Sequence, residues 1–227
     1  MTANICVSCD NKSCPVFNQG KEAKEIISKN TVRIGFKKDE MLFKQGAFST
    51  HLYYINSGYT KIYKEFPSKN LILKIANPEM ILGTASLFGT KTHLYSASFI
   101  GKGEVCQIDR NIFAQLLLKN PENSLELLLN QLYKSESEVF SRFASLTQKQ
   151  LHGRLADAIL YLSMEVFKSD RFEFPFTRRD LAELTSMSNE SAIKIFKEFQ
   201  NDGIVSLENN VLHILSLDLL KRISEIG

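Results

Sequence analysis

Hydrophobic and polar positions follow a strand-like pattern through the first half of the chain. Between residues 31 and 109, short runs rich in β-branched and aromatic residues alternate with turn-forming Gly, Pro, Asn and Ser residues. Many short strands without helices between them predict a small barrel or jelly roll, preceded by a short helix over Lys21–Lys29. The predicted strands are Thr31–Phe36, Met41–Phe43, His51–Ile55, Gly58–Glu65, Leu71–Ala76, Tyr95–Ile100 and Glu104–Ile108.

After Asp109 the period of the hydrophobic positions becomes helical. A short helix over Asn111–Leu118 precedes a long one from about Pro121 to Leu146, and proline suits a first helical turn. One stripe of the long helix repeats at alternating spacings of four and three residues, as in helices that pair side by side. We expect this stripe to form the seam of a homodimer rather than to pack on its own domain. Its members are Leu125, Leu129, Leu132, Glu136, Val139, Phe143 and Leu146.

The last third of the chain predicts a winged helix-turn-helix. Its first helix is expected to begin at Thr147-Gln148-Lys149-Gln150, which resembles a capped helix start. This helix is expected to end at about Phe167. Two short helices around a turn, then a hairpin and a closing helix, complete the pattern. The predicted elements are a strand Phe172–Phe176, helices Thr177–Leu184 and Asn189–Asn201 around the turn Ser186–Ser188, hairpin strands Ile204–Leu207 and Val211–Leu215, and a helix Ser216–Ile226.

The two helices around this turn carry the residues expected to contact DNA. In a helix-turn-helix the second helix enters the major groove, where Glu accepts a hydrogen bond from cytosine and Lys donates one to guanine. Glu190 and Lys194 share the outer face of that helix and are the candidate base readers, while nearby basic residues can hold phosphates. An ordinary helical hairpin with a solvated charged face is the alternative. The expected DNA-binding residues are Arg178, Arg179, Ser188, Asn189, Glu190, Ser191, Lys194 and Lys197, and the expected shared core is Leu181, Leu184, Met187, Ala192, Ile195, Phe196 and Phe199.

Composition neither requires nor excludes a nucleic-acid partner. The 227 residues are 44% hydrophobic and carry a net charge of +3. From Thr147 onward the chain has ten basic residues (Lys and Arg) and twelve acidic residues (Asp and Glu). A case for DNA binding must therefore come from the local arrangement of charge. The sequence contains no apolar run of membrane-spanning length and no pattern of a signal peptide, so we expect a cytoplasmic protein without a membrane partner.

The four cysteines form a candidate metal site. Cys6, Cys9 and Cys14 lie close together near the N-terminus, and Cys106 lies on the last predicted strand of the roll. In a reducing compartment, four thiolates suit an iron–sulfur cluster or zinc better than structural disulfides. A reduced tail and a small buried Cys106 are the alternatives. Haem is a further possibility, with candidate ligands His51, His93, His152 and His213.

Three segments resemble the Crp/Fnr family of transcription regulators. The segment from Gly35 to Gly46 resembles the opening of that family's cyclic-nucleotide-type roll, Tyr54 to Tyr63 resembles the next hairpin, and Thr177 to Lys197 resembles its DNA-binding module. The resemblance implies an α+β fold: a double-stranded β-helix (jelly roll), a long dimerisation helix and a winged helix-turn-helix. It places Glu190 and Lys194 where the family has its base-reading Glu and Arg. Lysine replaces a bidentate fork with a point charge, and Asn189 and Ile193 depart from both common family patterns, which puts the half-site sequence in doubt.

The resemblance also bears on the ligand. Family members that bind cyclic AMP have a Gly-Glu pair and then an Arg-Ser or Arg-Thr pair in their phosphate cassette. In the corresponding stretch, Ile81 to Ala97, Thr84 replaces the Glu, and no arginine occurs between Arg33 and Arg110. Because a buried phosphate needs a cation, we expect no cyclic AMP.

The cysteines resemble those of the Fnr branch, which holds a [4Fe-4S] cluster with three N-terminal cysteines and one in the strand that carries Cys106. The N-terminal spacing here is one residue tighter than in that branch.

These patterns predict a Crp/Fnr-type regulator that senses oxygen, redox state or nitric oxide through a cysteine-bound [4Fe-4S] cluster. The alternative is a roll that binds a small molecule other than cyclic AMP, with cysteines that hold zinc or have no role. We expect a homodimer on palindromic double-stranded DNA, acting with RNA polymerase. Enzyme motifs are lacking. The predicted domains are an N-terminal arm (1–20), a sensor roll (21–118), a dimerisation helix (119–146) and a DNA-binding domain (147–227).

Overall fold

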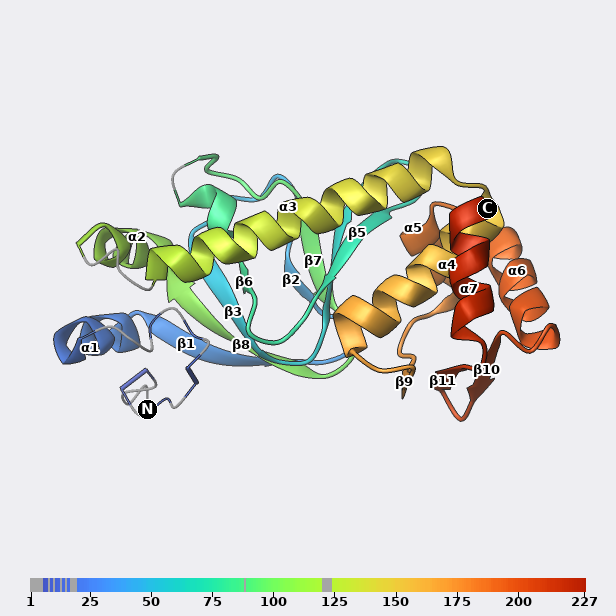
Figure 1. Ribbon diagram of the computed structural model, residues 1–227. Helices are drawn as coiled ribbons and strands as arrows, with labels where there is room; N and C mark the ends of the chain where they lie inside the picture. Colours follow the sequence, from blue (N-terminus) through green and yellow to red (C-terminus); the bar gives the residue numbers. More distant parts are fainter. Residues whose placement is uncertain are drawn as a thin grey trace. The chain divides into compact units, whose positions relative to one another are not determined.

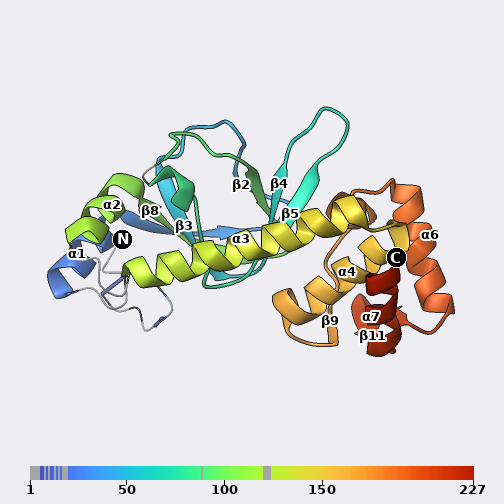
Figure 2. The ribbon, with the colours of Figure 1, turned by 45° about the horizontal axis from the view of Figure 1, so that its top comes forward.

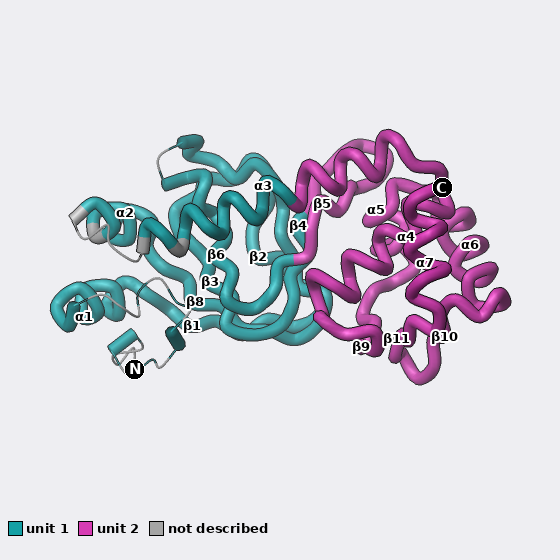
Figure 3. The backbone as a smooth tube through the Cα atoms, viewed as in Figure 1, with its two compact units in different colours: residues 1–62, 76–137 teal, residues 63–75, 138–227 magenta. Residues whose placement is uncertain are grey.

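The computed structural model in Figure 1 describes residues 20–87, 89–119 and 124–227, together with seven positions near the N-terminus. Those seven are Cys6, Val7, Cys9, Asn11, Lys12, Cys14 and Val16. The chain divides into two compact units, residues 1–62 with 76–137 and residues 63–75 with 138–227 (Figure 3).

Two four-stranded sheets form the predicted roll. One has the strand order β1-β8-β3-β6 and the other β2-β7-β4-β5. Several strands have the bounds that the hydrophobic pattern predicted. Strand β6 was not predicted, because its two residues are too few to show a hydrophobic period. The strands are β1 (Thr31–Phe36), β2 (Met41–Phe43), β3 (His51–Ser57), β4 (Thr60–Lys64), β5 (Leu71–Ala76), β6 (Ile81–Leu82), β7 (Ser96–Phe99) and β8 (Gly103–Asp109).

Strand β8 sends alternate side chains into two hydrophobic cores, because successive residues of a strand face opposite sides of the sheet. Val105 faces an inner core between the two sheets, where Ile55 and Phe99 are also buried. Cys106 and Ile108 face an outer core that the helices and the N-terminal segment cover. This alternation places the sulfur of Cys106 on the helix-covered side of the roll.

Three helices contribute to the outer core. They are α1 (Lys21–Lys29), α2 (Arg110–Lys119) and α3 (Ser124–Gln148). Figures 1 and 2 both show α1 and α2 side by side at one end of the roll. Ile27 of α1, Phe113 of α2 and Leu128 of α3 are buried in this core. The N-terminal segment is therefore packed against the same helices that cover Cys106.

Helix α3 leaves its predicted heptad stripe exposed. Leu129 is 54% exposed and Phe143 is 66% exposed, whereas Leu128, on another face of the helix, is 4% exposed. The Gln131 side chain hydrogen-bonds to both the backbone N–H and the carbonyl of Ile81, at 2.8 and 2.7 Å. Most of the stripe is thus exposed, with Leu146 half-buried, while the neighbouring face is anchored to the roll. The predicted start at Pro121 lies outside the described residues.

The capped helix start predicted at Thr147 is wrong. Helix α3 continues to Gln148, and the Thr147 hydroxyl donates to the carbonyl of Phe143 at 2.9 Å, inside the helix. A threonine hydroxyl can bond either way, and here the helical carbonyl four residues back is its partner. The next helix, α4 (Leu151–Tyr161), begins after Gln150 without a side-chain cap and continues as a π-helix over Leu162–Phe167.

The remaining elements form the predicted winged helix-turn-helix. The predicted strand Phe172–Phe176 is shorter in the structure, because β9 ends at Glu173, before Pro175, which has no N–H to donate to a sheet. The wing turns at Asn209 and Asn210, both with positive φ angles (49° and 64°), as in the turn type that suits a two-residue hairpin loop. No helix in the described ranges has the length and apolar character needed to cross a bilayer. The elements are β9 (Arg171–Glu173), α5 (Arg178–Thr185), α6 (Asn189–Asn201), β10 (Val205–Glu208), β11 (Val211–Ile214) and α7 (Leu217–Ile226).

Candidate nucleic-acid interface and cysteine site

Helix α5 begins with a reciprocal capping box. The Thr177 hydroxyl accepts from the backbone N–H of Asp180 at 3.0 Å, and the Asp180 carboxylate accepts from the backbone N–H of Thr177 at 2.9 Å. Ser186 ends the helix in the left-handed conformation, at φ 54°. The side chain of Met187, in the turn that follows, is buried at 2% exposed. The chain is therefore turned sharply toward α6 by local bonds and one buried side chain.

Helix α6 presents the predicted polar face to solvent. Its N-cap, Ser188, accepts from the backbone N–H of Ser191 at 3.1 Å. Glu190 and Lys194 are exposed one turn apart, while Ala192, 0% exposed, faces the core. All the residues predicted for the shared core of α5 and α6 are buried: Leu181, Leu184, Met187, Ala192, Ile195, Phe196 and Phe199.

The exposed face of α6 carries both an acidic and a basic side chain that could contact DNA. Hydrogen bonds from its own backbone N–H and from the Ser188 hydroxyl lower the pKa of the Glu190 carboxyl, so Glu190 is an ionised acceptor. Lys194 lies 3.9 Å from the Glu198 carboxylate, with its side chain 78% exposed, a loose pairing. Arg179 is bonded to the buried Glu183 at 2.7 Å. The other predicted DNA-binding residues, Arg178, Asn189 and Lys197, are exposed as well.

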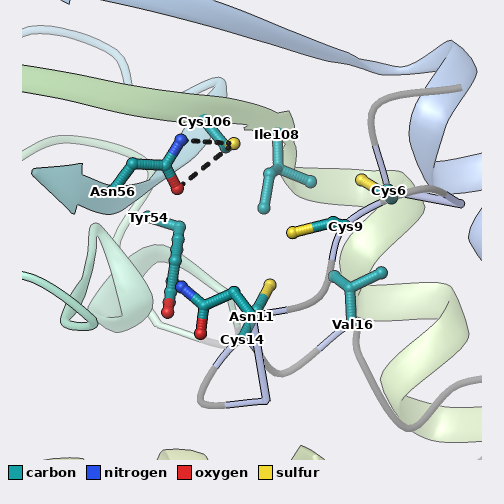
Figure 4. Close-up of a pocket in the computed structure, with 9 residues that line it drawn as sticks. All are labelled: Cys6, Cys9, Asn11, Cys14, Val16, Tyr54, Asn56, Cys106 and Ile108. Carbon is teal, nitrogen blue, oxygen red and sulfur yellow. Dashed lines mark hydrogen bonds between the residues drawn. The ribbon is translucent and has the colours of Figure 1, made fainter. Parts of the chain in front are cut away.

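All four cysteines line one pocket. Cys106 comes from β8, and Cys6, Cys9 and Cys14 come from the N-terminal segment. Figure 4 shows the four cysteine side chains among the residues that line the pocket. Val16, Tyr54 and Ile108 contribute to its walls. The cysteines are free thiols, with Cys6 and Cys106 buried and the other two half-buried.

The N-terminal segment is fixed at two described points beside this pocket. The backbone N–H of Cys6 donates to the hydroxyl of Ser28 in α1 at 2.8 Å. Val16, 2% exposed, is buried in the outer core together with Cys106. Three thiols close in sequence are thereby carried to a fourth that lies far along the chain.

Cys106 has polar neighbours that the sequence pattern did not single out. Asn56 was expected in a turn, but β3 continues to Ser57, and the Asn56 amide nitrogen lies 3.3 Å from the Cys106 sulfur. Arg33 is paired with Cys106 across β1 and β8, and its guanidinium lies 3.4 Å from the Glu104 carboxylate. No local motif marks either residue, because both reach Cys106 through strand pairing.

Burial disfavours the thiolate form of two of the four cysteines, Cys6 and Cys14. Burial raises the pKa of the Cys14 thiol to about 12, and burial also raises the pKa of the Cys6 thiol. Metals bind cysteine as the thiolate, so loading the pocket would release protons.

The donor set fits an iron–sulfur cluster, since four cysteine sulfurs, polarisable and partly shielded from water, are the ligands that such clusters use. A single metal ion needs its ligands closer together. Within the described part of the chain, no three Cys, His, Asp or Glu side chains lie close enough to hold one ion.

Two family profiles match the chain. The cyclic nucleotide-binding domain matches residues 33–120, and the Crp-like helix-turn-helix domain matches residues 153–223. The chain belongs to the Crp/Fnr family of transcription regulators.

Curated relatives of this Crp/Fnr regulator match most of its length. A CRP-like cAMP-activated global transcriptional regulator of Mycobacterium tuberculosis is 26% identical, over 90% of this chain and 94% of its own length. An anaerobic regulatory protein of Bacillus subtilis is 25% identical over 83% of each chain. The transcriptional activator protein Anr of Pseudomonas protegens is 23% identical, over 79% of this chain and 75% of its own.

Solved structures show the same fold. FixK2 from Bradyrhizobium japonicum superposes with a TM-score of 0.76 at 15% identity, covering 87% of this chain and 98% of that one. A transcriptional regulator of the Crp/Fnr family from Eubacterium rectale has a TM-score of 0.73 at 18% identity, covering 94% and 99%. The prediction of a Crp/Fnr-type regulator that is not an enzyme is thus confirmed.

The stretch of this Crp/Fnr regulator that corresponds to the phosphate cassette is held by internal polar contacts. Gly83, at φ 88°, leads into a short 3₁₀ turn over Thr84–Ser86. The Ser86 hydroxyl bonds to Ser49 at 2.9 Å. The ring of His93, 6% exposed, stacks on Phe43 with 3.9 Å between ring centroids, and burial lowers the pKa of His93. His93 is therefore neutral at pH 7 and supplies no cation.

Proposed function

We propose that this Crp/Fnr regulator controls transcription in response to oxygen or nitric oxide through a [4Fe-4S] cluster held by Cys6, Cys9, Cys14 and Cys106. The observation that carries this proposal is the convergence of every cysteine of the chain on one partly shielded pocket. This convergence of cysteines from two distant segments favours a shared ligand over four unrelated thiols. The name of the matched relative from Bacillus subtilis refers to anaerobic regulation.

Cyclic AMP is the less favoured ligand. The corresponding cassette lacks an arginine, and the neutral, stacked His93 does not replace one. The name of the mycobacterial relative refers to cyclic AMP, so this argument depends on residues of this chain and not on family membership.

In the proposed mechanism the cysteines hold the cluster and the surrounding residues limit access to it. The bound cluster supplies iron that reacts with oxygen or nitric oxide. Burial of Cys6 and Cys106 excludes water from that side, while the half-buried Cys9 and Cys14 leave a path for a small gas. The Cys6 backbone, bonded to Ser28, ties the occupied pocket to α1.

In the proposed mechanism, the gain or loss of the cluster affects α3 through the outer core. Leu128 of α3 is buried in the same core as Cys6 and Cys106. One turn further along, Gln131 holds α3 to β6. Because a packed core does not deform freely, filling the pocket shifts the balance between arrangements of this helix.

We propose that the regulator binds palindromic DNA as a homodimer whose seam is the exposed stripe of α3. Paired reading heads would lie roughly 34 Å apart, one DNA turn. Glu136 places like charges across the two-fold axis, so the monomer and dimer are close in free energy. Glu190 and Lys194 read bases, and the regulator acts in the cytoplasm with RNA polymerase.

The decisive experiment is purification under anaerobic conditions followed by iron and sulfide analysis and Mössbauer spectroscopy. We expect about four iron and four sulfide per chain for a [4Fe-4S] cluster. The single variants Cys6→Ala, Cys9→Ala, Cys14→Ala and Cys106→Ala should each lose most of the iron. The control Gln107→Leu should retain it, since residue 107 follows Cys106 on β8 and its side chain faces the other side of the sheet.

Other outcomes would contradict the proposal. A colourless protein with one zinc bound by the cysteines would make the site structural. A protein that binds no metal after reconstitution would leave the roll as a pocket for a small molecule other than cyclic AMP. Tight binding of cyclic AMP would overturn the argument from the cassette.

A further inference from the structure

Asn56 lies beside Cys106 on the helix-covered face of the roll. Tyr54 pairs directly with Cys106 across β3 and β8, and the register then shifts between Ile55 and Ser57. Alternation along β3 places Asn56, two residues after Tyr54, on the same face as Cys106. The Asn56 side chain lies against the Cys106 sulfur, as Figure 4 shows.

The Asn56 amide has two contacts with that sulfur. Its nitrogen lies 3.3 Å from the sulfur, and its oxygen lies 3.6 Å from it. When Cys106 is a thiol, it can donate to the amide oxygen. When Cys106 is a thiolate ligand, only the amide N–H₂ group can form a hydrogen bond with it. One side chain thus suits both the empty and the loaded pocket.

Glu104 and Arg33 determine which way the Asn56 amide faces. The amide nitrogen donates to the Glu104 carboxylate at 3.1 Å, and a carboxylate cannot accept from the amide oxygen. Glu104 therefore keeps the N–H₂ group on the side of Cys106. Arg33, at 3.4 Å from Glu104, offsets the carboxylate charge near the sulfur. Arg33, Glu104 and Asn56 form a chain of contacts that ends at the Cys106 sulfur.

We propose that Asn56 is a positioning residue that donates a hydrogen bond to the ligating sulfur of Cys106 and thereby sets the reduction potential and the air stability of the bound cluster. This inference rests on the proposed function. Hydrogen bonds to cluster sulfurs stabilise the more negatively charged, reduced state and so raise the reduction potential. The partners of metal ligands typically change affinity or activity by about 10- to 100-fold when they are removed.

The test compares Asn56→Asp and Asn56→Leu with wild type in the anaerobically loaded protein. Asn56→Asp has the same shape but replaces the donor with an acceptor, while Asn56→Leu removes the hydrogen bond without adding charge beside Glu104. The matched control is Gln107→Leu, since residue 107 follows Cys106 on β8 and its side chain faces the other side of the sheet. The readouts are the midpoint potential, the Fe–S(Cys) stretching frequencies in resonance Raman spectra, and the rate of cluster loss in air.

Both Asn56 variants should lower the midpoint potential, raise an Fe–S(Cys) stretching frequency and lose the cluster in air about ten-fold faster. Asn56→Asp should show the larger shift, because it adds negative charge beside the sulfur. Gln107→Leu should match wild type in all three readouts. A loaded wild type with Asn56 variants indistinguishable from Gln107→Leu would overturn this inference and leave the proposed function standing. A wild type that binds no cluster would overturn both.

Discussion

Glu190 and Lys194 stand one helical turn apart on the solvent face of α6, next to the cap that starts the helix. Residues at the N-terminal end of a recognition helix come closest to base edges. The ionised Glu190 is an acceptor, and Lys194 is a flexible point donor in a place where Arg would form a rigid fork. At the scale of single residues, these two side chains are therefore the main candidates for sequence specificity.

We predict that Glu190→Ala and Lys194→Ala each weaken binding to a duplex selected by the wild type from a random pool. The expected loss is about 1–3 kcal/mol each, the cost of a base-specific contact. Fluorescence anisotropy against the selected and a scrambled duplex measures it. Lys221→Ala, an exposed charge on α7, is the control and should change both affinities little. Equal losses on both duplexes would contradict base reading by these two residues.

Thr177 and Thr147 show why a helix begins at one threonine and not at another. Thr177 and Thr147 are each followed three positions later by a residue that can complete a capping box, Asp180 and Gln150, yet only Thr177 and Asp180 form the reciprocal bonds. Thr147 bonds backward to the carbonyl of Phe143, so α3 passes through it. At the scale of elements, a helix start depends on the reciprocal pair and not on the threonine alone.

We predict different costs for the same substitution at these positions. Thr177→Ala removes the cap of α5 and should destabilise the DNA-binding unit by about 0.5–2 kcal/mol. Thr147→Ala should change stability by less than about 0.5 kcal/mol, because an exposed hydroxyl inside a helix contributes little. Thermal unfolding followed by circular dichroism compares the two. Similar shifts in Tm would contradict the assignment of the cap.

A second prediction at the scale of elements concerns the stripe on α3. Glu136→Leu replaces the charged member of the heptad stripe and should tighten the dimer about ten-fold or more, equivalent to about 1.4 kcal/mol. Ser137→Leu introduces the same residue one position away, off the stripe, and should leave the dimer constant unchanged. Sedimentation equilibrium measures both. A dimer constant unaffected by Glu136→Leu would place the seam elsewhere.

Over the whole molecule, the cysteine pocket and the helix that carries the stripe share one core. Cys6, Cys106 and Leu128 are buried together, and in the proposed mechanism this shared core passes a change in the pocket to the helix that carries the stripe. The DNA-binding unit follows the same helix, whose later residues belong to it.

We predict that air shifts this regulator from dimer to monomer and lowers its affinity for the selected duplex. The loaded protein should sediment as a dimer without oxygen and largely as a monomer after exposure. Cys106→Ala should behave like the exposed protein under both conditions, and Gln107→Leu should respond as wild type does. A dimer of equal strength before and after exposure would separate sensing from dimerisation.

The sequence predicted much of the fold because its signals are local. The alternation in β1, the heptads of α3 and the turn between α5 and α6 each arise from residues close in sequence. Errors occurred where a short element left no period, as in β6, or where a local motif had two solutions, as at Thr147. Of the candidate site, the four cysteines and the exposed face of α6 followed from residue type and spacing.

By itself, the sequence determined the order of the elements, the helix-turn-helix with its outward polar face, and the identity of four candidate sulfur ligands. Only the tertiary structure decided that three N-terminal thiols meet Cys106 and that Asn56 lies against its sulfur. The physical reason is register: which residue faces another across a sheet depends on pairing between distant strands, and a shift of one residue turns every side chain to the other face. Such pairing leaves no trace in the spacing of residues along one strand.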